Sequence, residues 1–119
     1  MKININDIGG ALVKEDDRYV VKDNNDLKNL VVSSTDLKPG KQTTGHSHAG
    51  QEEVYIFVQG KGRMLLGSQK GDDLSIEDDF PVKEGDVVLI EDGKFHRVVN
   101  DSEEQLYFVC VFDGNRAHQ

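Results

Sequence analysis

The sequence predicts an all-β protein, built as a sandwich or a barrel of short strands. Apolar residues occur in short runs rich in β-branched and aromatic side chains, and Gly, Asp and Asn separate these runs. No segment keeps the 3.6-residue apolar period of an amphipathic helix. With 119 residues the chain has the length of one domain with one core, which we expect to span residues 1–119.

Each apolar run of strand length is expected to form a strand. Val87–Ile90 contains no polar residue, so we expect it to be buried on both faces. The acidic stretch Asp72–Asp79 is expected to form a solvated loop or a sheet edge, and Lys61 and Arg63 flank Gly62 in an expected turn. In chain order the expected strands are Tyr19–Val21, Leu30–Val32, Val54–Val58, Met64–Leu66, Val87–Ile90, Val98–Val99 and Leu106–Phe112.

Charge and composition exclude several classes of partner. The formal net charge is −8 and the basic residues do not cluster, which argues against nucleic acid and anionic membranes. No apolar stretch approaches the roughly 18 residues of a membrane span, and the first residues lack the apolar core of a signal peptide. Cys110 is the single cysteine and lies in an apolar run, so we expect a buried small hydrophobe. These features predict a soluble, cytoplasmic protein.

The first candidate for chemistry is Gly45-His46-Ser47-His48. Two histidines at positions i and i+2 of a strand point to the same face, with Cα atoms about 6.6 Å apart. Their imidazoles can then converge on one metal ion. The alternative is a pair of exposed polar residues beside a turn.

Glu53 is the candidate acidic partner of these histidines. A turn over residues 49–52 would place Glu53 on the face shared by Tyr55 and Phe57, whereas Glu52 remains the rival ligand. Either glutamate could instead be a solvated loop carboxylate. A third histidine, His96, opens a short expected strand after a turn-like segment.

Two longer motifs contain these residues. Residues 40–60 read Gly40-x5-His46-x-His48-x4-Glu53-x6-Gly60, and residues 85–100 read Gly85-x5-Glu91-x-Gly93-x2-His96-x3-Asn100. Both resemble the motifs of the cupins, with Glu91 where the second motif usually has proline. The resemblance implies a double-stranded β-helix, the cupin jelly-roll barrel. It also implies one divalent transition metal (Fe, Mn, Ni or Zn) held by His46, His48, Glu53 and His96.

A narrower resemblance is to the cupin-type phosphoglucose isomerases, although this chain is shorter and lacks counterparts of their upstream phosphate-contacting residues. It implies aldose–ketose isomerisation of a sugar phosphate, with a metal acting as a Lewis acid. Glu53 is then the candidate catalytic base, and Tyr55 either orients substrate hydroxyls or is a core aromatic. Thr43, Thr44 and Arg97 are the nearest phosphate partners, although strand alternation from His96 favours a solvent-facing Arg97. The segments that carry the resemblance are Thr44–His48, Glu53–Tyr55, Gly60–Gly62, Met64–Leu66, His96–Arg97 and Val99–Asn100.

Two other functions remain open for a small-molecule substrate: an iron-dependent cupin dioxygenase, and a non-catalytic module that binds metal or carbohydrate. His118 is either an acid–base or lid residue over the barrel mouth or part of a disordered terminus. We also expect a homodimer, formed through unpaired strand edges in Arg18–Val21 and Lys28–Asp36.

Overall fold

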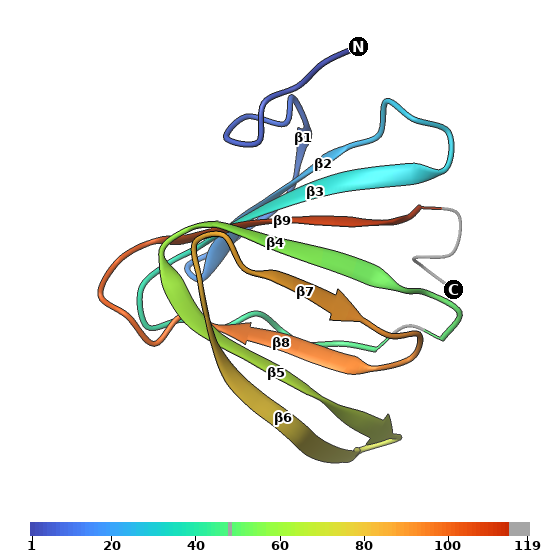
Figure 1. Cartoon of the computed structure of the whole chain (residues 1–119), viewed down its shortest axis with the longest axis vertical. Helices are drawn as coiled ribbons and strands as arrows, with labels where there is room; N and C mark the ends of the chain where they lie inside the picture. The colour runs from blue at the N-terminus through green and yellow to red at the C-terminus, as the bar shows by residue number, and fades with distance from the viewer. Residues whose placement is uncertain (48, 115–119) are drawn as a thin grey trace.

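The structure is a computed structural model that describes residues 1–47 and 49–114. These residues form two antiparallel β-sheets that pack against each other (Figure 1). The described residues contain no helix, and hence none long and apolar enough to cross a membrane. The strands are β1 (Ala11–Glu15), β2 (Tyr19–Asn24), β3 (Leu30–Leu37), β4 (Glu53–Gln59), β5 (Lys61–Lys70), β6 (Asp73–Lys83), β7 (Val87–Ile90), β8 (Phe95–Val99) and β9 (Leu106–Asp113).

The larger sheet has the order β1-β2-β3-β9-β4-β7, and the smaller has the order β6-β5-β8. The last strand, β9, lies in the middle of the larger sheet, between β3 and β4. This pairing closes the fold around residues far apart in the sequence. The all-β prediction is therefore confirmed.

Alternation along the strands determines which side chains form the core between the sheets. In β4, Glu53, Tyr55 and Phe57 are buried, whereas the residues between them are half-buried. Phe57 packs with Phe108 of β9, their ring centroids 5.3 Å apart, and the core also includes Met64 of the smaller sheet. At the Glu53 end of β4, the inward-facing positions are polar instead of apolar. This end of the core contains the candidate site.

Every predicted apolar run lies within a strand, but the prediction for Val87–Ile90 was wrong in its burial. This run forms β7, which pairs only with β4 and is thus an edge of the larger sheet. Val87 and Leu89 are 56% and 71% exposed, whereas Val88 and Ile90 face the core. A run without polar residues was therefore compatible with an edge strand that is buried on one face.

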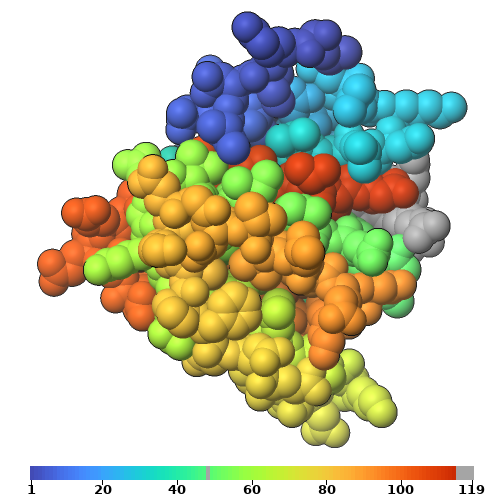
Figure 2. Space-filling view, viewed as in Figure 1, coloured from blue at the N-terminus to red at the C-terminus, as the bar shows by residue number. Residues whose placement is uncertain are grey.

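The turn predicted at Gly62 was also wrong, because Lys61 and Arg63 lie within β5. Gly62 instead permits a close approach: a Cβ there would overlap the Val99 carbonyl oxygen of β8. Of the two predictions for Asp72–Asp79, the sheet edge is correct, since β6 pairs only with β5. The hairpin of these two strands projects from the body of the molecule (Figure 2).

The strands assigned to dimerisation are not at an edge. β2 pairs with β1 and β3, and β3 pairs with β2 and β9, so neither has a free side. The sequence did not reveal β1, whose five residues are all exposed and which covers the edge of β2. The expected homodimer thus loses the reason first given for it and remains a prediction.

Candidate metal centre

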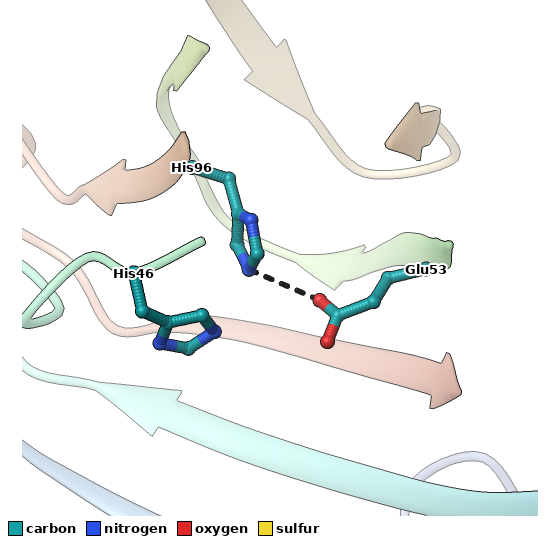
Figure 3. A group of neighbouring side chains, drawn as sticks. All are labelled: His46, Glu53 and His96. Atoms are coloured by element: carbon teal, nitrogen blue, oxygen red, sulfur yellow. Dashed lines mark ion pairs between the residues drawn. The ribbon is translucent and has the colours of Figure 1, made fainter. Parts of the chain in front are cut away.

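His46, Glu53 and His96 come together at one end of the space between the sheets (Figure 3). Glu53 is the first residue of β4 in the larger sheet, and His96 belongs to β8 in the smaller one. His46 lies in the segment that precedes β4. Each of these residues offers a ligand atom, and these atoms all lie within 4.8 Å of one another.

His46 is positioned by the backbone of His96. The two residues form an isolated antiparallel bridge, in which each N–H donates to the other's carbonyl oxygen at 3.1 and 2.9 Å. Their rings meet edge to face, with centroids 4.4 Å apart. His46 is exposed at the rim, in a local bridge and not in the strand assumed for the His-x-His pair. His48, the other histidine of that pair, lies outside the described residues, as does His118.

Glu53 is the glutamate that turns inward. It is 7% exposed, whereas Glu52 lies on the surface, as the parity argument predicted. The turn at 49–50, where Gly50 has a φ of +81°, resets the alternation of inward and outward side chains between His46 and Glu53.

The contact between His96 and Glu53 fits a cation. The Lys94 carbonyl oxygen lies 3.1 Å from Nδ1 of His96. Because a carbonyl can only accept, Nδ1 carries the hydrogen of this contact, and in that tautomer Nε2 presents its lone pair. Nε2 lies 3.0 Å from Oε2 of Glu53, yet it is buried without a hydrogen-bond partner. Two buried electron-pair donors that face each other are favourable when a positive ion lies between them.

The composition of the group also fits a divalent transition metal. Two imidazoles and a carboxylate suit iron, manganese, nickel and zinc. The fit does not discriminate among these ions. Cys110 is buried outside the group, in agreement with its prediction as a small hydrophobe. Burial, and then the nearby Glu53 carboxylate, raises the pKa of its thiol.

Gln51 is a residue that sequence reasoning missed. It is buried, and its Nε2 donates to Oε1 of Glu53 at 2.9 Å. This bond occupies the carboxylate oxygen that does not face His96. Gln51 lies two residues before Glu53 and shares its parity, so the argument that placed Tyr55 inside could have found it.

Tyr55 lies beside the group. Its ring centroid is 5.6 Å from that of His96, and its ring stacks on Phe108 at 5.4 Å. Burial is the main cause that raises the pKa of the Tyr55 hydroxyl, followed by Cys110 and Glu53. The side chain is therefore a neutral phenol, able to donate a hydrogen bond.

The predicted phosphate partners have other roles in this structure. Thr43 Oγ1 accepts the Val98 N–H at 3.0 Å. Arg97 is not solvent-facing as expected, since it is half-buried, donates from Nη2 to the Thr44 carbonyl at 2.8 Å and lies over the Phe95 ring. Thr44 Oγ1 accepts from Arg18 at 3.0 Å.

Comparison with known proteins decides the family. Residues 33–112 match the Cupin domain family. The chain belongs to the cupins. The predicted double-stranded β-helix is confirmed by a solved protein with that domain from Klebsiella pneumoniae, which shares 17% identity and has a TM-score of 0.74 over 98% of this cupin and 92% of that chain.

Other relatives extend the comparison. The glucose-6-phosphate isomerase of Pyrococcus horikoshii is 33% identical over 84% of this cupin and 55% of its own length, and that of Pyrococcus abyssi is 31% identical over 90% and 61%. This cupin thus spans little more than half the length of the curated isomerases it matches. The oxalate decarboxylase of Bacillus subtilis shares its fold, with a TM-score of 0.70 and 23% identity over 82% of this cupin and 26% of that chain.

The candidate metal-binding group, His46, Glu53 and His96, lines a cavity of about 200 Å³ within the cupin barrel. Ser33 and Thr35 of β3 and Asp23 of β2 also line it, and these residues project from the inner face of the larger sheet. The volume corresponds to about seven water molecules, so the cavity suits a small ligand.

Proposed function

We propose that this cupin binds one divalent transition metal through His46, His48, Glu53 and His96, and that it isomerises a small hydroxy-carbonyl compound of the aldose–ketose type. The observation that carries the proposal is the buried pairing of a histidine lone pair with the Glu53 carboxylate, 3.0 Å apart. That pairing lines the cavity, whose lining also includes the exposed His46.

The metal, when bound, would supply a Lewis acid that polarises a carbonyl or hydroxyl oxygen. The remaining steps belong to the protein. A carboxylate oxygen of Glu53 takes the proton from the carbon beside the substrate carbonyl and returns it to the former carbonyl carbon. A hydroxyl proton moves between the two oxygens, through an enediol, so the reaction is balanced without an oxidant or reductant.

Gln51 and Tyr55 have supporting roles in this proposal. Gln51 holds the orientation of the Glu53 carboxylate through its 2.9 Å hydrogen bond. Tyr55 is a buried neutral phenol beside His96, and it donates to a substrate oxygen. A carboxylate that also binds the metal is a weakened base, so orientation by Gln51 matters more here than for a free carboxylate.

The likeness to the glucose-6-phosphate isomerases supports isomerisation over other cupin reactions. It spans most of this chain but little more than half of those enzymes. Their reaction is therefore a guide to the chemistry of this cupin, whereas its substrate depends on the lining of its own cavity.

The test begins with elemental analysis of the untagged full chain, alongside His46→Ala, His48→Ala, Glu53→Gln, His96→Ala and the surface control Glu52→Gln. We expect about one transition metal per chain in the wild type and the control, and a strong loss in the other four. Metal-free wild-type protein that also fails to take up added Mn, Fe, Ni or Zn would overturn the proposal.

Chemistry is then tested by NMR in D₂O, with D-arabinose and D-erythrose as probes. Isomerisation predicts metal-dependent exchange of the proton beside the carbonyl for deuterium, lost in Glu53→Gln. Substrate-dependent oxygen uptake by the iron form would instead indicate the dioxygenase. Ligand binding without exchange or oxygen uptake would indicate the binding module.

A further inference from the structure

Among the described residues, the cavity is lined by carboxylates and histidines but by no lysine or arginine. Asp23 and Glu53 supply the carboxylates. Most enclosed phosphate sites use arginine, lysine or an array of backbone N–H groups to balance the phosphate charge. This lining is unsuited to that role.

Each of the three cationic side chains near the rim, Arg18, Arg97 and Lys14, already contacts a neighbouring group of the protein. Arg18 forms an ion pair with Asp16 at 2.9 Å and also donates to Thr44. Nη2 of Arg97 donates to the Thr44 carbonyl oxygen, whereas its buried Nε has no hydrogen-bond partner. Lys14 lies over the Tyr19 ring, 5.4 Å from its centroid.

The polar groups on the larger sheet form a row. Asp23, Ser33, Cys110 and Tyr55 are successive register partners across β2, β3, β9 and β4. At about 4.8 Å per strand, Ser33 and Asp23 lie roughly 10 and 14 Å from Tyr55 along the sheet. A ligand at the candidate metal-binding group that extends along this row therefore reaches first the Ser33 hydroxyl and then the Asp23 carboxylate.

A second acceptor lies beside the candidate metal-binding group. Oε1 of Gln51 is buried and has no hydrogen-bond partner, although Gln51 lines the cavity. Because its Nε2 is bonded to Glu53, the amide orientation is determined and the orphaned atom is an acceptor. A buried acceptor without a partner favours a ligand that brings a donor.

We propose that the cavity selects an uncharged, hydroxyl-rich ligand, an unphosphorylated sugar or a similar hydroxy-carbonyl compound, and that Asp23 and Gln51 are its specificity-determining residues. This inference rests on the proposed function. A divalent ion would be balanced by the two carboxylates, Glu53 and Asp23, so the loaded cavity has no net charge to attract a phosphate dianion. Hydroxyl groups donate to Oε1 of Gln51 and to Asp23, whereas a phosphate at the Asp23 end meets a like charge.

The experiment uses two matched pairs of probes: D-arabinose with D-arabinose 5-phosphate, and D-erythrose with D-erythrose 4-phosphate. Binding to the Mn²⁺-loaded full chain is measured by calorimetry and by the ligand-induced change in water proton relaxation. Neither readout requires turnover. We expect each free sugar to bind about tenfold more tightly than its phosphate, because the Asp23 carboxylate would repel the phosphate.

Variants assign the effect to residues. Asp23→Asn should bring the sugar and its phosphate to within about threefold of each other, whereas the exposed control Asp72→Asn should retain the tenfold preference. Gln51→Leu should weaken the binding of both probes about equally, since it removes an acceptor and not a charge.

Three outcomes would overturn the inference while metal binding stands: tighter binding of the phosphates, equal binding of both members of a pair, or binding of neither. A phosphate preference that disappears in Arg18→Gln would assign recognition to the rim cations instead. Failure of the protein to bind any metal is a different result and refutes the proposed function itself.

Discussion

Nε2 of His96 lies 3.0 Å from Oε2 of Glu53, with both side chains more than nine-tenths buried, yet the two atoms form no hydrogen bond. The Lys94 carbonyl fixes this arrangement by holding the hydrogen on Nδ1. The buried Nε2 of His96 costs stability, because it has lost water without gaining a hydrogen-bond partner. A positive ion between the two atoms would convert this cost into a stabilising interaction.

We therefore expect a bound divalent metal to stabilise the fold. At a free metal concentration of 100 times Kd, the free energy of unfolding should rise by about 2.7 kcal/mol. For a domain of this size that corresponds to roughly 10 °C or more in Tm. Differential scanning calorimetry with added Mn²⁺, followed by excess EDTA, measures the gain and its reversal.

His96→Ala and Glu53→Gln serve as the matched variants, with Glu52→Gln as the surface control. The first two should show no Mn²⁺-dependent rise in Tm, and the control should show the full rise. A normal rise in His96→Ala would remove His96 from the set of ligands.

Asn100 is expected to be a major contributor to stability. It is fully buried, and its Nδ2 donates to the carbonyl oxygens of Leu37 at 3.0 Å and Glu104 at 2.7 Å. Asn100→Ala leaves both acceptors without this donor, so we expect a loss of about 2–4 kcal/mol in urea unfolding. Ser102→Ala, which removes a partially exposed hydroxyl bonded to Oδ1 of Asn100, should cost about 1 kcal/mol or less. Equal losses would contradict this role.

Gly60 and Gly85 allow two structural requirements for glycine to be measured separately: a positive φ and a close approach of the backbone. Both have positive φ, +89° and +94°, but a Cβ at Gly60 would overlap the Gln105 carbonyl, whereas a Cβ at Gly85 would meet no atom within 4 Å. Gly85→Ala should cost about 1–2 kcal/mol from backbone strain alone. Gly60→Ala should cost at least about 1 kcal/mol more, because the β4–β5 connection must also move. Urea unfolding of the two variants, side by side, tests this difference.

Local patterns were sufficient for the positions of most strands and for the inward face of β4. The parity that placed Glu53 with Tyr55 holds because a strand alternates strictly once the turn at Gly50 has ended. His96 was found in the same way, from a turn followed by a short apolar run.

Properties that depend on strand order were not predictable in this way. Val87 and Leu89 are exposed because β7 is an edge, and the edge is defined by pairing with a strand more than 30 residues away. Arg97 is held by the Thr44 carbonyl, a contact 53 positions apart in the sequence. The orphaned oxygen of Gln51 likewise becomes evident only when the whole lining of the cavity is assembled.

The homodimer remains a prediction, now with different strands at the free edges. β7 presents Val87 and Leu89 to solvent at one end of the larger sheet, and an apolar edge favours pairing with another chain. Size-exclusion chromatography with light scattering should give twice the chain mass of 13.3 kDa at micromolar concentration. A mass of 13.3 kDa would refute the dimer, and loss of the dimer in Leu89→Lys would place it at this edge.

Asp16 should give the protein a measurable loss of stability in acid. Hydrogen bonds from Arg18, first from its side chain and then from its backbone N–H, lower the pKa of this carboxyl from 3.8 to about 2. Because the pKa in the folded state is the lower one, the contribution of Asp16 to stability is complete above the unfolded value and disappears as the pH falls from 3.8 toward 2. The difference in free energy of unfolding between wild type and Asp16→Asn should therefore be constant above about pH 5 and shrink toward zero below about pH 2. Urea unfolding at a series of pH values measures it, and a difference that grows on acidification would show that the Arg18 pair does not stabilise the folded state.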